Sequence, residues 1–391
     1  MSCNIFVYLV LLTIITYSFA EVDFSKSGTF DYDSLTVSIP GDGETMSNSM
    51  IYHPWDNGKV PDQAKPCPIV VFGHGWQMPI DRYNSYARHL ATWGYIVVLP
   101  TFSNPVVNPE HERRSRCLIA AARYIVNLNN QSSSRLFNAV DTDNWGFAGH
   151  SLGGSLSLLA ASLYGVQLRD SLHAVVSFSG PKTTPDTQEE NILCAKMILG
   201  GTKDKICDWI QMRADMWDKA KKPGVFAIIK GANHNQFMDY STPLEDIFDG
   251  KADINRLLQL KLARRHMTAY IERYLKNDKS KWNYSFCYGD SMKGSSYMDT
   301  VETREDEMGF RMNLMAKLLP DRDFSVSPNP VKYSCNFKGF YGKVYIYDSM
   351  GKLVDIHSTK TSWIPDRKLK NGVYIASSEN GKSKILIILR D

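Results

Sequence analysis

The sequence predicts an α/β protein with a doubly wound, mostly parallel sheet, followed by a small all-β sandwich domain. Three observations support this fold class. Short, continuously apolar segments alternate with helical segments over residues 67–275, which is typical of parallel strands buried on both faces. Glycine-rich turns follow several of the apolar segments. After residue 323 the alternation stops, and short strands separated by turn signals take over.

The predicted elements follow one another in regular order. Two strands at residues 30–39 and 48–53 are expected to pair antiparallel. Buried strands are then predicted at residues 67–75, 95–100, 144–149, 173–180, 194–201 and 225–231. Helices are predicted between them at residues 82–94, 108–130 and 151–165, with a last helix at 253–275. Because ligands bind beyond the carboxyl ends of such strands, the loops that follow them should hold the site.

The two ends of the chain have a different character from its centre. Residues 1–20 are apolar and uncharged and end in a small-x-small pattern, which predicts a secretory signal peptide, with an uncleaved anchor as the alternative. The α/β domain is predicted over residues 21–282. A polar connector is predicted over 283–322, with a short helix at 310–319. The all-β domain is predicted over 323–391.

Composition excludes several classes of function. The net charge of +4 is too small to indicate a nucleic-acid-binding protein, and no later segment is apolar enough to cross a membrane. Six cysteines follow the signal peptide at spacings that match no metal motif. Export would permit disulfides, but the sequence does not decide their pairing. We expect no metal and no cofactor.

One pentapeptide carries a candidate nucleophile. Residues 149–153 read G-H-S-L-G, with Ser151 at the centre between a predicted strand and a predicted helix. A serine that is presented on such a tight turn needs glycine two residues before and two residues after it, because side chains there would clash. A Gly-rich packing turn or a phosphate-binding loop is the alternative interpretation of these residues.

A serine nucleophile requires a base and an acid that orients the base. Asp204 and His234 end two later strands at the same predicted edge, and they follow Ser151 in the order serine, acid, histidine. Asp208 and Asp215 are rival acids that fall within a helix. His266 is expected on a helix surface, and the side chain of His150 is expected to point away from the serine. We expect activity to fall as His234 is protonated, at about pH 6–7.

The oxyanion of a tetrahedral intermediate needs backbone N–H donors. We predict these donors at Leu152, directly after the serine, and at Trp76, in the turn after the strand at residues 67–75. Further side chains near this edge are candidates for substrate contact, although ordinary core packing is the alternative for each. The candidates are Trp76, Gln77, Met78, Phe102, Trp209 and Phe237.

The motifs VVFGHGW, GFAGHSLGG, GGTKD and GANH together resemble the α/β-hydrolase superfamily over about residues 30–277. Within it the chain is similar to the secreted esterases of the dienelactone hydrolase, cutinase, polyester hydrolase and chlorophyllase branches. The resemblance implies an α/β-hydrolase fold and an ester substrate. One position differs, because polyester hydrolases usually carry Trp where this chain has His150, and this difference argues against plastic-type substrates.

The C-terminal segments SPNP, VYIYDSMGKLV, LKNGVYI and SKILIIL resemble the sorting domain of type IX secretion. The resemblance implies the type IX export machinery as a partner and a secreted or cell-surface location. A small β-sandwich that binds carbohydrate or another partner is the alternative.

The sequence therefore predicts a secreted serine carboxylesterase that works through an acyl-enzyme. No inserted segment is long enough to fold into a lid, so the site is expected to be open. A peptidase, amidase or acyltransferase on the same triad is one alternative. A catalytically inactive surface-binding protein is the alternative from another class.

Overall fold

A computed structural model describes residues 22–103 and 110–305, called the α/β unit below. It also describes most of residues 325–388, called the C-terminal β unit. The predicted signal peptide and the predicted helix at 310–319 lie outside the described residues. Among the helices of the described residues, none has the length and apolar character that crossing a membrane requires.

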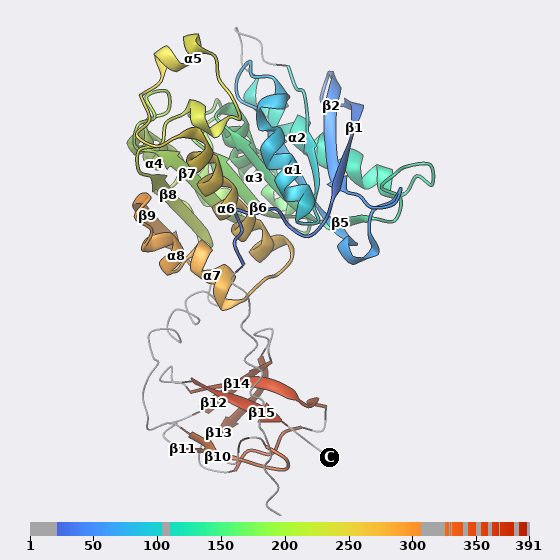
Figure 1. The fold of residues 1–391 in the computed structure, drawn as a ribbon, viewed down its shortest axis with the longest axis vertical. Helices are drawn as coiled ribbons and strands as arrows, with labels where there is room; N and C mark the ends of the chain where they lie inside the picture. Colours follow the sequence, from blue (N-terminus) through green and yellow to red (C-terminus); the bar gives the residue numbers. More distant parts are fainter. Residues whose placement is uncertain are drawn as a thin grey trace, which may run out of the picture.

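The α/β unit is built on a nine-stranded sheet with the order β1-β2-β4-β3-β5-β6-β7-β8-β9 (Figure 1). Neighbouring strands from β4 through β8 run parallel, whereas β1, β2 and β9 join antiparallel at the edges. The strands are β1 (Tyr32–Pro40), β2 (Thr45–Pro54), β3 (Cys67–Gly73), β4 (Ile96–Leu99), β5 (Val140–His150), β6 (Leu172–Phe178), β7 (Ala195–Gly201), β8 (Gly224–Ile229) and β9 (Met298–Arg304). The predicted antiparallel first pair is confirmed.

Helices cover both faces of this sheet. The longer helices are α1 (Asn84–Thr92), α2 (His111–Asn129), α3 (Leu152–Leu168), α4 (Trp209–Met216) and α6 (Arg256–Leu275). The shorter ones are α5 (Pro243–Phe248), α7 (Lys281–Cys287) and α8 (Asp290–Lys293), with 3-10 turns η2 (Ile80–Tyr83), η3 (Glu189–Asn191) and η4 (Asn235–Phe237). One core joins the sheet to α2, α3 and α4, and the other joins it to α1, α6, α7 and α8.

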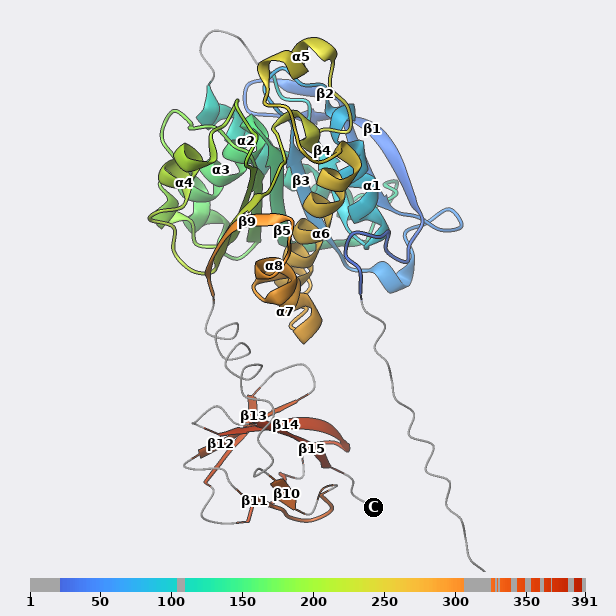
Figure 2. The same ribbon diagram turned by 60° about the vertical axis from the view of Figure 1, so that its left-hand side comes forward.

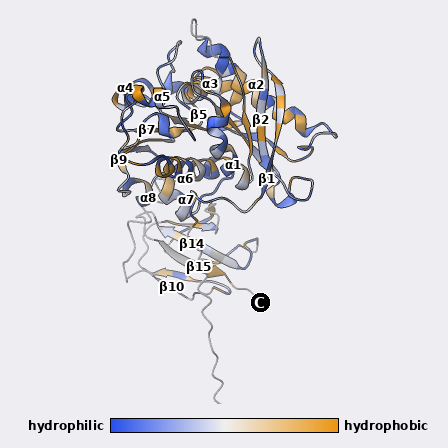
Figure 3. Cartoon of the chain, turned by 45° about the horizontal axis from the view of Figure 1, so that its top comes forward, coloured by the Kyte–Doolittle hydropathy of each residue, from blue (hydrophilic) through white to orange (hydrophobic). Residues whose placement is uncertain are grey.

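Alternation along β3 explains why there are two cores. Ile69 and Val71 belong to the first core, while Val70 and Phe72 belong to the second. Successive side chains of a strand point to opposite faces, so a continuously apolar strand serves both layers. Figure 3 shows hydrophobic colours concentrated on α3 and the strands beside it, and nearly every residue of α3 is buried.

The structure differs from the predicted connector at its beginning. Residues 283–304 contain most of α7, all of α8 and β9, and β9 pairs antiparallel with β8 along the sheet edge (Figure 2). The sequence of β9, MDTVETR, is polar because an edge strand is only half-buried. Glu302 in this strand binds Arg213 and accepts a hydrogen bond from the Trp217 indole at 2.9 Å. The sheet therefore extends past the predicted boundary at residue 282.

The described strands of the C-terminal β unit agree with a small all-β domain. They form a four-stranded antiparallel sheet of order β13-β12-β14-β15 and a two-stranded pair β10-β11. The strands are β10 (Ser325–Ser327), β11 (Asn336–Lys338), β12 (Lys343–Asp348), β13 (Leu353–Ser358), β14 (Gly372–Ser378) and β15 (Ser383–Ile388). This unit has its own apolar core around Trp363, Val344 and Ile346.

Candidate active site

The turn between β5 and α3 holds Ser151 in a strained backbone conformation. β5 ends at His150 and α3 begins at Leu152, so Ser151 alone joins strand to helix, with φ 52° and ψ −127°. A positive φ is unfavourable for a residue with a side chain and is characteristic of a sharp turn that presents a nucleophile. The Ser151 N–H donates to the Phe178 carbonyl at 2.8 Å, which fixes the turn to β6.

The glycines on either side of Ser151 leave no room for a side chain. A Cβ on Gly149 would lie 2.4 Å from the carbonyl carbon of Gly153. A Cβ on Gly153 would lie 2.1 Å from the carbonyl oxygen of Gly73 at the end of β3. Both contacts are with backbone, which cannot rotate away. The glycines therefore let α3 pack against the ends of β3 and β5, as the pentapeptide predicted.

Asp204 and His234 form a buried hydrogen-bonded pair. His234 Nδ1 lies 2.9 Å from Asp204 Oδ2, and both residues are almost fully buried. The other carboxylate oxygen, Oδ1, accepts the backbone N–H groups of Ile206 and Cys207 at 2.9 and 2.7 Å. Because Nδ1 is held by the carboxylate, Nε2 of the neutral imidazole is the atom left to accept a proton.

Two opposing effects set the pKa of His234. Burial lowers it, because an apolar environment disfavours the charged imidazolium. The Asp204 carboxylate outweighs burial, a contact with the Cys207 side chain acts in the same direction, and the pKa of His234 is raised to about 10. The buried carboxylate therefore favours a midpoint above the predicted range of about 6–7, and the pH dependence of activity stays a prediction.

The serine turn and the acid–base pair approach each other through His150. The ring of His150, one residue before Ser151, lies 4.5 Å from the ring of His234, with 50° between the ring planes. Asp204 follows β7, His234 follows β8, and Ser151 follows β5. The structure therefore brings the three predicted residues to the carboxyl-end edge of one sheet.

The turn after β3 lies beside Ser151. A Cβ on Gly75 would be 3.5 Å from Cβ of Ser151. The turn closes with a hydrogen bond from the Met78 N–H to the Gly75 carbonyl at 3.1 Å, and Gln77 adopts a positive φ of 56°. Trp76 lies within this turn, and Leu152 opens α3 directly after the serine. Both predicted oxyanion donors thus belong to segments that flank Ser151.

The alternative acids Asp208 and Asp215, and the histidine His266, interact with groups outside the candidate site. Asp208 caps α4 by accepting the N–H groups of Ile210 and Gln211 at 3.0 Å. Asp215 accepts a hydrogen bond from the Gln211 side chain at 2.9 Å. His266, expected on the surface, is buried instead, with Nδ1 3.1 Å from the Phe286 carbonyl. α6 packs against α7 within the second core, and His266 faces Phe286 of α7 there.

The family of the chain is shown by a family model described as PETase, PET hydrolase-like, which matches residues 20–303. The chain belongs to the PET hydrolase-like family. It is accordingly a hydrolase with the α/β-hydrolase fold. The matched range ends at β9, in agreement with the sheet edge and not with the predicted boundary at 282. No curated protein matches the chain.

Membership of the PET hydrolase-like family changes the interpretation of His150. Histidine in place of the usual tryptophan at this position argues against polyester substrates, yet the chain still belongs to the family. In the structure His150 is buried, and its Nδ1 lies 3.0 Å from the Tyr83 hydroxyl. Its ring therefore faces the interior of the protein.

The candidate substrate contacts differ in exposure: those in the turn after β3 are exposed or half-buried, and the others are packed against protein. Trp76 is 44% exposed, Gln77 is also exposed, and Met78 is half-buried with its Sδ 3.2 Å from Arg82. Phe237 is fully buried and stacks on Phe178 with ring centroids 5.5 Å apart, so it has no surface to offer a substrate.

Phe102 and Trp209 also pack mainly against protein. The Phe102 ring stacks on His74 with centroids 4.0 Å apart and is nearly buried. Trp209 is half-buried and packs against the first core. Phe237 and Phe102 are thus packed in the core of the described structure, and their contact with a substrate stays a prediction. The sequence could not separate core from rim, because both use aromatic side chains.

An exposed apolar rim borders the candidate site in this PET hydrolase-like chain. The loop that carries α5 is tied to the loops that hold Asp204 and His234, because Asp249 accepts the N–H groups of Lys205 and Asn235 at 3.3 and 2.8 Å. Figures 1 and 2 both draw α5 at the top of the α/β unit. The exposed apolar side chains of this region are Trp76, Ile206, Ile210, Tyr240, Leu244, Ile247 and Phe248.

Two residues of the site were not predicted from the sequence. Tyr83 ends η2 and places its hydroxyl 3.0 Å from both the Gly75 nitrogen and His150 Nδ1. Cys207 contacts His234 and donates its backbone N–H to Asp204. No motif marks either residue, since only the fold brings them to the site. All six described cysteines are free.

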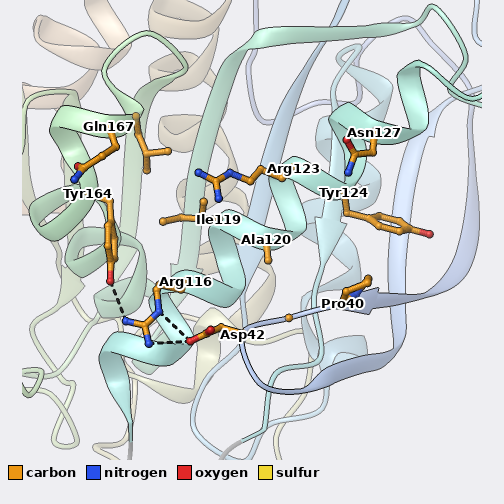
Figure 4. A pocket seen from close by; sticks show the side chains of 12 residues that line it. Pro40, Asp42, Arg116, Ile119, Ala120, Arg123, Tyr124, Asn127, Tyr164 and Gln167 are labelled. Atoms are coloured by element: carbon orange, nitrogen blue, oxygen red, sulfur yellow. Dashed lines mark hydrogen bonds and ion pairs between the residues drawn. The ribbon is translucent and has the colours of Figure 1, made fainter.

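A separate hollow of about 510 Å³ lies between α2, α3 and the β1–β2 turn (Figure 4). Arg116 joins its walls by contacting Asp42 at 2.8 Å and the Tyr164 hydroxyl at 3.0 Å. None of the predicted site residues lines it. Across the described ranges, no three or more His, Cys, Asp or Glu side chains are grouped to hold a metal ion.

Proposed function

We propose that this protein is a serine carboxylic-ester hydrolase in which Ser151 is the nucleophile, His234 the general base and Asp204 the group that orients the base. The observation that carries the proposal is the buried 2.9 Å contact between Asp204 and His234, next to the strained turn of Ser151. A serine hydroxyl is a weak nucleophile by itself and needs an oriented base of this kind. Family membership supports the same reaction class.

The reaction proceeds in two halves. His234 Nε2 takes the proton of the Ser151 hydroxyl as its oxygen bonds to the ester carbonyl carbon, and the imidazolium then gives that proton to the departing alcohol. The acyl-enzyme is cleaved by water, which His234 deprotonates, and the carboxylic acid leaves as Ser151 regains its proton. Asp204 holds the imidazole in position and stabilises its positive charge through both halves.

The backbone N–H groups of Trp76 and Leu152 are proposed to bind the oxyanion. Support comes from their position, because the turn after β3 and the first residue of α3 flank Ser151 on two sides. Donors that are already in place need no rearrangement as charge develops on the carbonyl oxygen. The N-terminal end of α3 adds a favourable dipole at the same point.

Replacing the nucleophile tests the proposal. Ser151→Ala should lower kcat for p-nitrophenyl acetate by about 10⁶-fold, the loss typical of removing such a serine, with folding intact. The matched control is Ser162→Ala, a serine within α3 whose hydroxyl bonds only the Gln188 backbone in the described structure. The control should retain activity. Turnover retained by Ser151→Ala would contradict the assignment.

We propose hydrophobic and polymeric esters as the substrate class. The exposed apolar side chains of α5 and of the loops after β7 support this, because apolar surface next to a site favours apolar ligands. Esters of graded acyl length, a polyester film and an amide of one common acyl group would test it. Faster turnover with longer acyl chains supports the proposal. Comparable turnover of the amide would favour a peptidase or amidase, and transfer of the acyl group to an alcohol would favour an acyltransferase.

We further propose that the chain is exported and that residues 323–391 form a type IX sorting domain. Support comes from the C-terminal motifs and from the separate apolar core of the C-terminal β unit. In a host that has this export system, removing residues 323–391 should abolish esterase activity in the medium and retain it inside cells. Unchanged activity in the medium would favour the alternative, a β unit that binds another partner.

A further inference from the structure

Two buried hydrogen bonds and one ring contact join the turn after β3 to the catalytic histidine. The backbone N–H of Gly75 donates to the Tyr83 hydroxyl oxygen at 3.0 Å. The same hydroxyl lies 3.0 Å from His150 Nδ1 on the other side. The His150 ring then lies 4.5 Å from the His234 ring. Tyr83 and His150 are both almost completely buried, so water does not compete for these contacts.

Donation from Gly75 through Tyr83 to His150 uses the hydrogen-bonding capacity of every group in the chain. A backbone N–H can only donate, so the Tyr83 oxygen accepts from Gly75. The single Tyr83 proton is then free to be donated to Nδ1 of a neutral His150. A protonated His150 would leave the Tyr83 proton without its acceptor. Burial, with the charge of His234 next, holds the pKa of His150 well below its usual range, which agrees with the neutral ring.

The Tyr83 hydroxyl thus lies between the turn after β3 and the end of β5, the two segments next to Ser151. Gly75 directly precedes Trp76, the proposed oxyanion donor, while His150 directly precedes Ser151. Tyr83 itself is anchored in the core, where its ring lies 5.4 Å from the Phe72 ring of β3. A shift of the turn after β3 would leave the buried Gly75 N–H without a partner, which is unfavourable.

We propose that Tyr83 and His150 are positioning residues, which hold the oxyanion turn and the ring of His234 in register with Ser151. This inference rests on the proposed function, because it assigns a role in the same reaction. Neither residue contacts the substrate. Their effect is on the placement of groups that do, so it should appear in the chemical step and not in substrate affinity.

The decisive variant is Tyr83→Phe, which keeps the ring and removes only the hydroxyl. We expect kcat for p-nitrophenyl acetate to fall about ten-fold with KM within about two-fold, because a misplaced oxyanion donor costs less than the 10²–10³-fold of a deleted one. The rate constant for labelling by a fluorophosphonate should fall in parallel. The matched control is Tyr270→Phe, a fully buried tyrosine whose hydroxyl donates to the Lys196 carbonyl near the start of β7.

The control separates positioning from general loss of a buried hydrogen bond. Wild-type kcat in Tyr270→Phe with a lowered kcat in Tyr83→Phe supports the inference. Equal kcat in the two variants, whether both unchanged or both lowered, overturns it. If Tyr83→Phe does not fold, His150→Asn and His150→Leu decide, because Asn can place an acceptor near Nδ1 whereas Leu cannot. A higher kcat in His150→Asn than in His150→Leu supports the inference, and equal kcat values in the two variants overturn it.

The two proposals fail in different ways. A wild-type protein that neither hydrolyses p-nitrophenyl acetate nor reacts with the fluorophosphonate refutes the proposed function. An active, labelled wild-type protein whose Tyr83→Phe variant matches Tyr270→Phe refutes only the positioning role.

Discussion

The two turns that flank Ser151 are held in place by different means. The turn between β5 and α3 is fixed by backbone packing, since a Cβ on Gly153 would lie 2.1 Å from the Gly73 carbonyl. The turn after β3 is fixed by its own hydrogen bond from Met78 to Gly75 and by the side chain of Tyr83, eight residues after Gly75, whose hydroxyl lies 3.0 Å from the Gly75 nitrogen. Steric packing of glycines leaves a recognisable motif in the sequence, whereas support by a single tyrosine hydroxyl does not.

The largest effect should follow from breaking the backbone-packed turn. Gly153→Ala forces a Cβ against backbone that cannot move, and we expect it to destabilise the fold by about 3 kcal/mol or more and to abolish esterase activity. The matched control is Gly165→Ala in the same helix, where the new Cβ would meet Asn191 at an ordinary 3.4 Å. Denaturant unfolding of both variants checks this. Equal stability of the two would contradict the packing argument.

The next largest effect concerns the carboxylate behind His234. Asp204→Asn keeps the shape of the side chain but removes the charge that orients and stabilises the imidazolium. We expect kcat to fall by about 10⁴-fold, as for comparable triads. Asp208→Asn, which alters only the cap of α4, is the control and should lose helix stability but little activity. Steady-state kinetics on both variants measure the difference, and similar kcat values would refute the role of Asp204.

A moderate effect is expected on the pH dependence. Because His234 must be neutral to accept a proton and its pKa is raised, kcat/KM should rise with pH with a midpoint above the ordinary value of about 6.5. The Asp204–His234 pair should also add to the free energy of unfolding. This contribution should be complete below about pH 6.5, where His234 is also protonated in the unfolded chain, and should be lost as the pH rises through the raised pKa of His234. A kcat/KM profile from pH 5 to 10 tests the first point. A midpoint below 6.5 would show that Asp204 does not dominate the pKa.

The smallest effect is expected from the side chain of an oxyanion donor. Trp76→Ala keeps the backbone N–H and removes only the 44% exposed indole. We expect KM to rise about three- to ten-fold for large esters, while kcat changes less than about three-fold, because uniform substrate binding is lost. Kinetics with a short and a long ester provide the comparison. A fall in kcat of a hundred-fold or more would mean that the indole holds the turn in place.

The fold and the candidate triad could be predicted from the sequence, because glycine spacing and apolar strands are visible as local patterns. Ser151 is marked by its two glycines, and Asp204 and His234 are marked by their positions directly after buried strands. The structure brings these three residues to one edge of the sheet. β9 could not be predicted in the same way, because a half-buried edge strand is polar and lacks a continuous apolar run.

The rest of the site depends on tertiary contacts that a single sequence does not express. Tyr83 has the pattern of an ordinary helix residue, and Cys207 follows Asp204 with no motif. Phe237 and Trp76 are both aromatic residues near the edge, yet one is fully buried and the other is exposed. Phe237 is buried because η4, which contains it, packs against α6, a helix that begins at Arg256.

If His234 activates Ser151 as a nucleophile, Ser151 should react selectively with a fluorophosphonate. Mass spectrometry of the protein after this reaction tests the activation. We expect one adduct, on the peptide that contains Ser151. We also expect a labelling rate at least a hundred-fold lower in His234→Ala, since the base is then missing (on the order of 10²–10⁴ for general-base catalysis). An adduct on another residue, or labelling of Ser151 at the same rate without His234, would contradict it.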